Sequence, residues 1–128
     1  MPRLPSLRLA GILLGMAILL WIPFEDSGTI WVRLFSLLVC MLAAITIGSK
    51  IPLAKRRLWY AWPAVGLVAG LLVTPTAILL MALKSGIHGH GSPDFTPAQV
   101  SAVLSNWPIW AMSGLLAGLA ASIWQRVR

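Results

Sequence analysis

Two histidines and an aspartate lie close together in the C-terminal half of the chain, in the segment 88–94. Imidazole and carboxylate groups this close can contribute to a metal site, and a single imidazole can ligate a haem or chlorophyll-type ring. A complete metal site needs more ligands, and the chain has no other histidine. His88, His90 and Asp94 are therefore candidates for metal or pigment binding, for pH sensing, or for hydrogen bonding and contact with a partner.

Arg33 is the charged residue inside the apolar stretch 30–48. A charge costs about 2.5–3.5 kcal/mol at the centre of a membrane-spanning helix and less near its end. Arg33 therefore either reaches the membrane surface and pairs with Glu25 or Asp26, or is a buried functional charge that contacts a partner subunit or an anionic ligand. Since the apolar stretches contain no acid and no nucleophile with a recognisable base, we predict that the protein is not an enzyme.

The composition predicts that the bilayer is the solvent of this chain. Hydrophobic residues make up 59% of its 128 residues and charged residues 10%, whereas a soluble domain carries roughly 25% charged residues. The net charge of +7 comes from short basic clusters between long apolar runs. Such clusters set membrane orientation and attract anionic lipids, so we expect lipid contact and no nucleic-acid binding. The lone cysteine, Cys40, is expected to be a small packing residue.

The elements that must position these residues are four membrane spans. The apolar runs predict an all-α, integral membrane four-helix bundle that forms a single transmembrane domain over residues 1–128, with spans at about 8–24, 30–48, 58–83 and 108–125. An outer loop and a short interfacial helix occupy 84–106. Ser85-Gly86 is expected to end the third helix. Thr96-Pro97-Ala98-Gln99 predicts the start of the interfacial helix, with a capping box between Thr96 and Gln99.

The charges predict an orientation. All three acids fall on one side of this topology, and of the 10 basic residues only Arg33 and Lys84 fall with them. The positive-inside rule then places both termini in the cytoplasm, and the opposite face toward the periplasm or the lumen of an internal membrane. The seven tryptophans all fall near predicted span ends, as expected for interfacial anchors.

Glycine pairs four residues apart predict close helix contacts. Such pairs let two backbones approach where lipid gives no hydrophobic drive, and the weaker pair Ala44 and Gly48 lies in the second span. Pro75 is expected to bend the third span and is a candidate hinge, with neighbouring threonine hydroxyls satisfying the freed carbonyls. We expect the glycine faces to close the bundle; the alternative is that they bind another subunit. The pairs are Gly11 and Gly15, Gly66 and Gly70, and Gly114 and Gly118.

The segment 84–95, together with Pro108-Ile109-Trp110 and Gly114-Leu115-Leu116, resembles small uncharacterised membrane proteins of cyanobacteria. The resemblance covers the C-terminal half of the chain. It implies a thylakoid or plasma membrane and a photosynthetic complex as partner. It implies no catalytic residue.

These features favour a non-catalytic accessory subunit or assembly factor of a larger membrane complex, with other membrane protein subunits as partners. One alternative is a small homo-oligomeric channel or transporter, in which Pro75 and Arg33 would act. A second alternative is a cofactor-binding membrane protein that holds haem, chlorophyll or a metal at His88 or His90. The spans lack the internal repeat typical of many transporters.

Overall fold

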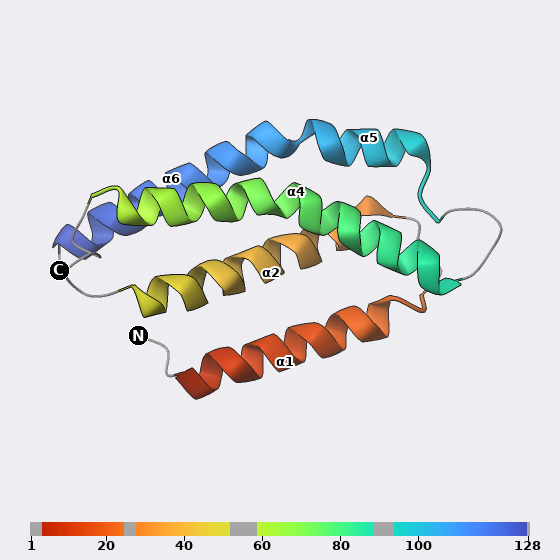
Figure 1. Cartoon of the computed structure of the whole chain (residues 1–128), viewed down its shortest axis with the longest axis horizontal. Coiled ribbons are helices and arrows are strands. Elements are labelled where there is room, and N and C mark those ends of the chain that lie inside the picture. The colour runs from red at the N-terminus through yellow and green to blue at the C-terminus, as the bar shows by residue number, and fades with distance from the viewer. Residues whose placement is uncertain (1–3, 25–27, 52–58, 89–93, 128) are drawn as a thin grey trace.

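The computed structural model describes residues 4–24, 28–51, 59–88 and 94–127, and all regular secondary structure in these ranges is helical. Successive long helices run in opposite directions (Figure 1). Leu4 and Val127 lie at one end of the molecule, which we call the terminal end, and the other end is the α5 end. The helices are α1 (Leu4–Trp21), α2 (Thr29–Lys50), α4 (Ala61–His88), α5 (Pro97–Ser105) and α6 (Trp107–Val127).

Three helical segments are long and apolar enough to cross a membrane, judged by length and composition: α2, α4 and the segment 97–127 that contains α5 and α6. α1 is apolar and shorter. α2 ends where Ile51 takes an extended conformation, with φ −67° and ψ 126°. Residue 52 is a proline, which disfavours helical geometry in the residue before it, so the end of α2 follows from the sequence.

α4 continues to His88, beyond the predicted span end at residue 83, so the expected stop at Ser85-Gly86 is wrong. Glycine ends a helix by taking a left-handed conformation, and Gly86 remains helical. Pro75 lies inside α4, which changes direction along its length (Figure 1). The expected role of the threonines is wrong as well. Thr74 Oγ1 is buried without a hydrogen-bond partner among the described residues, and the Thr76 hydroxyl contacts Cys40.

The capping box at the start of α5 is confirmed. The Gln99 backbone N–H donates to Thr96 Oγ1 at 3.3 Å, and the Thr96 backbone N–H donates to Gln99 Oε1 at 2.8 Å. α5 ends at Ser105, its C-cap Asn106 keeps a right-handed helical conformation, and α6 begins at the next residue. Proline at the second position of α6 costs nothing there because its missing N–H would have had no intrahelical partner.

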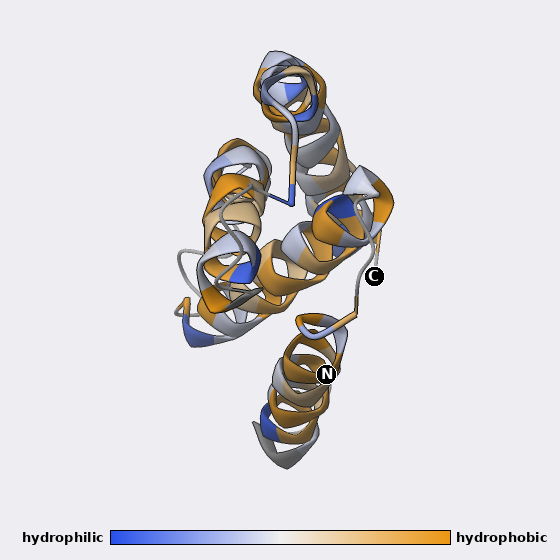
Figure 2. Ribbon diagram, turned by 90° about the vertical axis from the view of Figure 1, so that its right-hand side faces the viewer, coloured by the Kyte–Doolittle hydropathy of each residue, from blue (hydrophilic) through white to orange (hydrophobic). Residues whose placement is uncertain are grey.

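The helix contacts run in series. α1 packs on α2, α2 on α4 and α4 on α6, while α5 contacts α4 and α6. Contact between α1 and α6, which would close the predicted bundle, is not among the extensive helix contacts of the described residues. Figure 2, which looks onto the α5 end, shows α1 at one edge of the group of helices, with hydrophobic residues along its ribbon. The main buried cluster lies at the α5 end, where Trp21 of α1 meets Phe35 of α2, Ala77 of α4 and Val103 of α5.

Candidate functional site

Four of the predicted packing glycines form one seam between α4 and α6. A Cβ atom added to Gly66 would overlap the Gly114 carbonyl, and one added to Gly114 would overlap the Gly66 carbonyl. Gly70 lies in the same way against the Trp110 carbonyl, and Gly118 against the Trp62 carbonyl. The two backbones are therefore in direct contact, and no side chain fits between them. We call this contact the glycine seam.

Two polar contacts join α4 and its preceding turn to α6 at the terminal end of the glycine seam. The Trp62 indole N–H donates to Gln125 Oε1 at 2.8 Å, and the Ser122 hydroxyl donates to the Trp59 carbonyl at 3.1 Å. The Trp62 ring also occupies the space beside Gly48, where an added Cβ would lie 2.7 Å from a ring carbon. The Trp62 side chain of α4 therefore packs against α2 at Gly48.

The first glycine pair has a different environment. A Cβ atom at Gly11 would lie 3.5 Å from Leu42 Cδ2, which is ordinary contact, and one at Gly15 would meet nothing within 4 Å. The structure therefore does not bring Gly15 against another described helix. Large apolar side chains around it are exposed, and we call them, with Gly15, the open face of α1. They are Leu9, Ile12, Leu13, Met16, Leu19 and Leu20.

A buried lysine holds the α5 end together. Lys84 is only 1% exposed, and its Nζ lies 4.3 Å from the centroid of the Trp21 ring and 5.9 Å from that of Phe95. An ammonium group within about 6 Å of an aromatic face is attracted by the ring quadrupole. The Trp21 ring also packs on Phe35, with a centroid distance of 5.4 Å. One cation on α4 thus contacts the end of α1 and the residue that precedes the α5 cap.

The sequence prediction missed this lysine, which it placed in a loop. A signal was present, because Ala77, Leu80, Met81 and Lys84 follow the i, i+3, i+4, i+7 spacing of one helix face. All four are buried. Trp21, predicted to be an interfacial anchor, is 7% exposed and belongs to the buried cluster. The apolar stem of lysine lets this residue extend a hydrophobic face by one turn.

The remaining predicted site residues have separate outcomes. Arg33 is half-buried in α2, and its Nε is buried without a hydrogen-bond partner among the described residues. Its predicted partners, Glu25 and Asp26, lie outside the described residues. Asp94 is half-buried near the start of α5. His88 is the last residue of α4, and His90 lies outside the described residues. Metal, pigment and pH-sensing roles of the two histidines therefore stay predictions.

Two donors at the α5 end are buried without acceptors in the described part of the chain. They are the indole N–H of Trp21 and the Nε–H of Arg33. A buried polar group without a partner costs about 1–3 kcal/mol, so such groups usually meet water or a ligand. Within the same ranges, no group of three His, Cys, Asp or Glu residues lies close enough to hold a metal ion.

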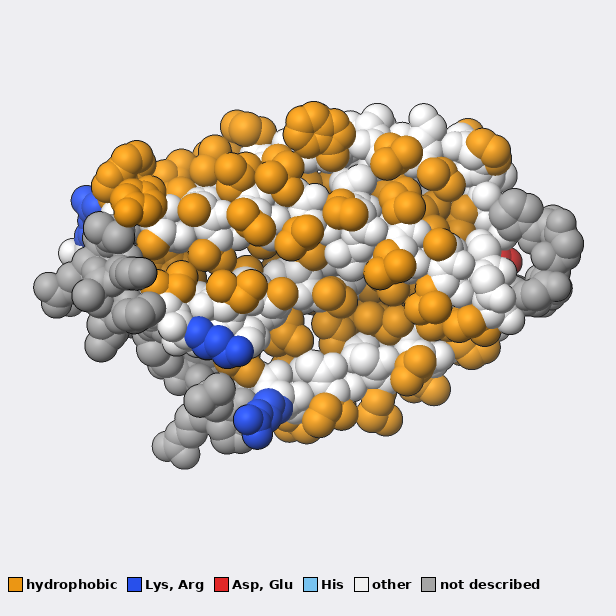
Figure 3. All heavy atoms as spheres, viewed as in Figure 1, with side chains coloured by type: hydrophobic (Ala, Val, Ile, Leu, Met, Phe, Trp, Pro, Cys, Tyr) orange, Lys and Arg blue, Asp and Glu red, His pale blue; other side chains and the backbone are white. Residues whose placement is uncertain are grey.

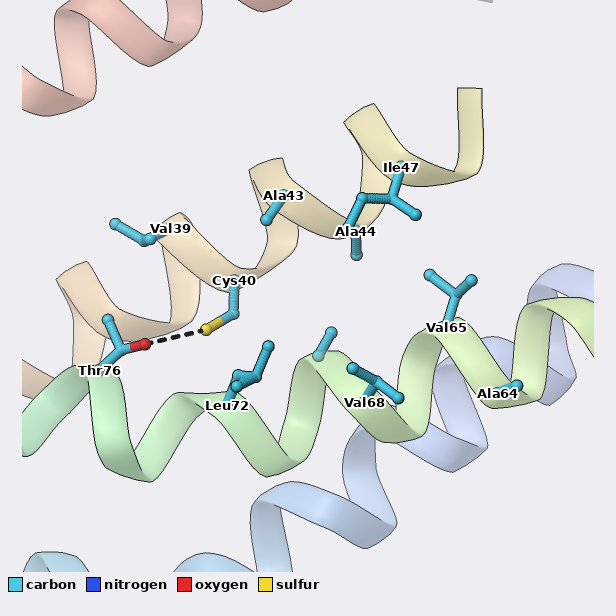
Figure 4. Close-up of a pocket in the computed structure, with 11 residues that line it drawn as sticks. Val39, Cys40, Ala43, Ala44, Ile47, Ala64, Val65, Val68, Leu72 and Thr76 are labelled. Carbon is cyan, nitrogen blue, oxygen red and sulfur yellow. Dashed lines mark hydrogen bonds between the residues drawn. The ribbon is translucent and has the colours of Figure 1, made fainter. Parts of the chain in front are cut away.

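An apolar groove separates α2 from α4 on one side of their contact (Figure 4). Its volume is about 390 Å³, and we call it the α2–α4 groove. Cys40 Sγ and Thr76 Oγ1 lie 3.7 Å apart in its wall. Its lining residues are Val39, Cys40, Ala43, Ala44 and Ile47 of α2, and Ala64, Val65, Val68, Ala69, Leu72 and Thr76 of α4.

Known proteins add no relative to these observations. No protein family matches this chain, and neither a curated protein nor a solved structure matches it. What can be said of its function therefore comes from its own residues.

Proposed function

We propose that this chain is a non-catalytic integral membrane protein that docks on another membrane subunit, as an accessory subunit or assembly factor. Three long apolar helical segments support the membrane placement. Large apolar side chains are exposed along every long helix, including Ile12, Met41, Leu79 and Ile123. Such a surface is stable against lipid and unfavourable against water. α1 would be the fourth span, because its shorter apolar run can be extended by the snorkelling stem of Arg8.

The distribution of charge supports an orientation with the terminal end in the cytoplasm. On the face that Figure 3 shows, the basic side chains lie at the terminal end and an acidic one lies at the α5 end. Two described basic residues, Arg33 and Lys84, lie toward the α5 end and are half-buried and buried, respectively. Arg8, Lys50 and Arg126 are exposed near the ends of α1, α2 and α6. Cytoplasmic segments carry the excess of Lys and Arg, so the α5 end would face the periplasm or a lumen.

The observation that carries the docking proposal is the open face of α1. A glycine in a helix interior costs about 0.8–1.0 kcal/mol relative to alanine, and in membranes small residues let helices approach closely. At the glycine seam, two helices of the same chain, α4 and α6, approach each other in this way. At Gly15 the space is empty and bordered by exposed Ile12 and Met16. A helix of a partner subunit would fill that space, as α6 does for α4.

Gly15→Leu tests the proposal, because it adds a side chain to the open face at a position where a Cβ meets no described residue within 4 Å. Gly86→Leu is the matched control, since a Cβ at Gly86 also meets nothing within 4 Å. A tagged chain is extracted in mild detergent, separated on a native gel and identified by mass spectrometry. We expect the wild type and Gly86→Leu to migrate with a larger complex and Gly15→Leu to migrate alone.

Two outcomes contradict the proposal. If Gly15→Leu stays in the complex, the partner does not bind the open face of α1. If the wild type forms a small homogeneous band that contains only this chain, the accessory role is wrong. A homo-oligomeric channel or transporter would then be favoured, with Arg33 as the intramembrane charge to mutate first.

A further inference from the structure

We propose that the α2–α4 groove binds one acyl chain of an anionic phospholipid, with the lipid headgroup against Lys50. The inference rests on the membrane placement proposed above and does not depend on a protein partner. It adds a lipid-binding site between α2 and α4, separate from the open face of α1 that is proposed to meet a partner subunit.

The chemistry of the groove selects an aliphatic ligand. Nine of its lining residues are Ala, Val, Leu or Ile, and the other two, Cys40 and Thr76, contact each other. Alanines at 43, 44, 64 and 69 keep the groove open, because larger side chains at these positions would fill it.

The length of the groove fits one leaflet of a bilayer. Along α2 it runs from Val39 to Ile47, which is about 12 Å at 1.5 Å per residue. Half of a hydrocarbon core of about 30 Å is close to this length. The groove occupies the terminal-end half of α2 and stops near the Cys40–Thr76 contact at mid-helix. A helix of a partner protein would need a groove that extends across the whole membrane. An acyl chain of a lipid ends at the midplane of the bilayer, so a groove of half that length is enough.

Charge complementarity identifies the headgroup as anionic. Ala43, Ile47 and Lys50 follow the i, i+4, i+7 spacing, so Lys50 continues the face of α2 that lines the groove. Lys50 is exposed in the last turn of α2 and can reach a phosphate at the membrane surface. The described acid, Asp94, lies at the other end of the molecule. A lysine near the membrane surface raises the affinity for an anionic lipid about fivefold.

The test is native mass spectrometry of the purified full chain in detergent with phosphatidylglycerol or phosphatidylcholine of identical acyl chains. The wild type is expected to retain phosphatidylglycerol about fivefold better than phosphatidylcholine. Lys50→Gln should remove this preference, and Arg126→Gln, an exposed cation at the same end, should keep it. Ala43→Leu should lower retention of both lipids, whereas Ala120→Leu, an exposed alanine outside the groove, should not.

Three results would overturn the proposal. The first is equal retention of the two lipids by the wild type. The second is a preference that Lys50→Gln and Arg126→Gln reduce to the same extent. The third is an oligomer that Ala43→Leu dissociates without changing lipid retention, because a second copy would then occupy the groove. Since the isolated chain is measured, loss of the protein partner in the Gly15→Leu experiment leaves this result unaffected, and the two proposals can fail separately.

Discussion

The α4–α6 side and the α1 side of the molecule carry the same glycine spacing and use it differently. Gly66 and Gly114 each lie against the backbone carbonyl of the other, so the missing side chain on each helix makes room for the backbone of the other. α1 faces α2, where the corresponding small residue, Gly48, is already covered by the ring of Trp62. A Gly-x-x-x-Gly pair therefore predicts a capacity for close approach. Whether the approach occurs within the chain depends on the facing helix.

The largest expected effect comes from breaking the glycine seam. Gly114→Leu places a side chain where the Gly66 carbonyl lies, so the two backbones must separate along their length. We expect a loss of at least about 4 kcal/mol in the free energy of unfolding, at the upper end of single-substitution effects. Denaturant unfolding in detergent micelles, followed by circular dichroism, measures it. A loss below 1 kcal/mol would show that α4 and α6 do not pack through their backbones.

The second effect concerns Lys84, which links the end of α1 to α4. Lys84→Met keeps the apolar stem and removes the ammonium group over Trp21. We expect a loss of about 2 kcal/mol, because the cation–π contact is desolvated. Lys50→Met, at an exposed lysine, should change the same unfolding free energy by less than about 0.5 kcal/mol. Equal effects of the two substitutions would mean that Lys84 is not buried.

The third effect has the opposite sign and concerns the open face of α1. In the isolated chain, Gly15→Leu should raise the free energy of unfolding by up to about 0.8 kcal/mol, because leucine favours a helix more than glycine does. The same unfolding assay, with Gly86→Leu as the matched control, measures it. A loss comparable to that of Gly114→Leu would show that α1 packs on the rest of the chain through Gly15.

The smallest effect concerns the terminal end of the glycine seam. Gln125→Ala removes the acceptor of the Trp62 indole N–H. Since the contact is exposed, we expect a loss of about 0.5 kcal/mol, at the low end for hydrogen bonds. A double-mutant cycle with Trp62→Phe isolates the contact. Additive losses in that cycle would contradict a hydrogen bond between the two side chains.

Features that depend on local spacing could be predicted from the sequence. The Thr96–Gln99 capping box is one, and the end of α2 before Pro52 is another. Both are decided within a few residues of the chain. The glycine spacing also placed Gly66 and Gly70 on one helix face, and the structure brings that face against α6.

Features that depend on distant neighbours could not be predicted. The continuation of α4 past Gly86 coincides with the burial of Lys84 against Trp21, a residue on another helix. The same distant contact turns Trp21 from an expected surface anchor into a core residue. Nor does the sequence distinguish Gly15 from Gly70, since the difference lies in what faces each of them.

The most direct test of the central claim is photo-crosslinking from the open face of α1 in intact membranes. A photoreactive residue replaces Ile12, and in a control chain it replaces Ile123, an equally exposed residue on α6. We predict a discrete protein adduct from position 12 and none from position 123. The same adducts from both positions, or no protein adduct from position 12, would contradict the claim that α1 is the docking face.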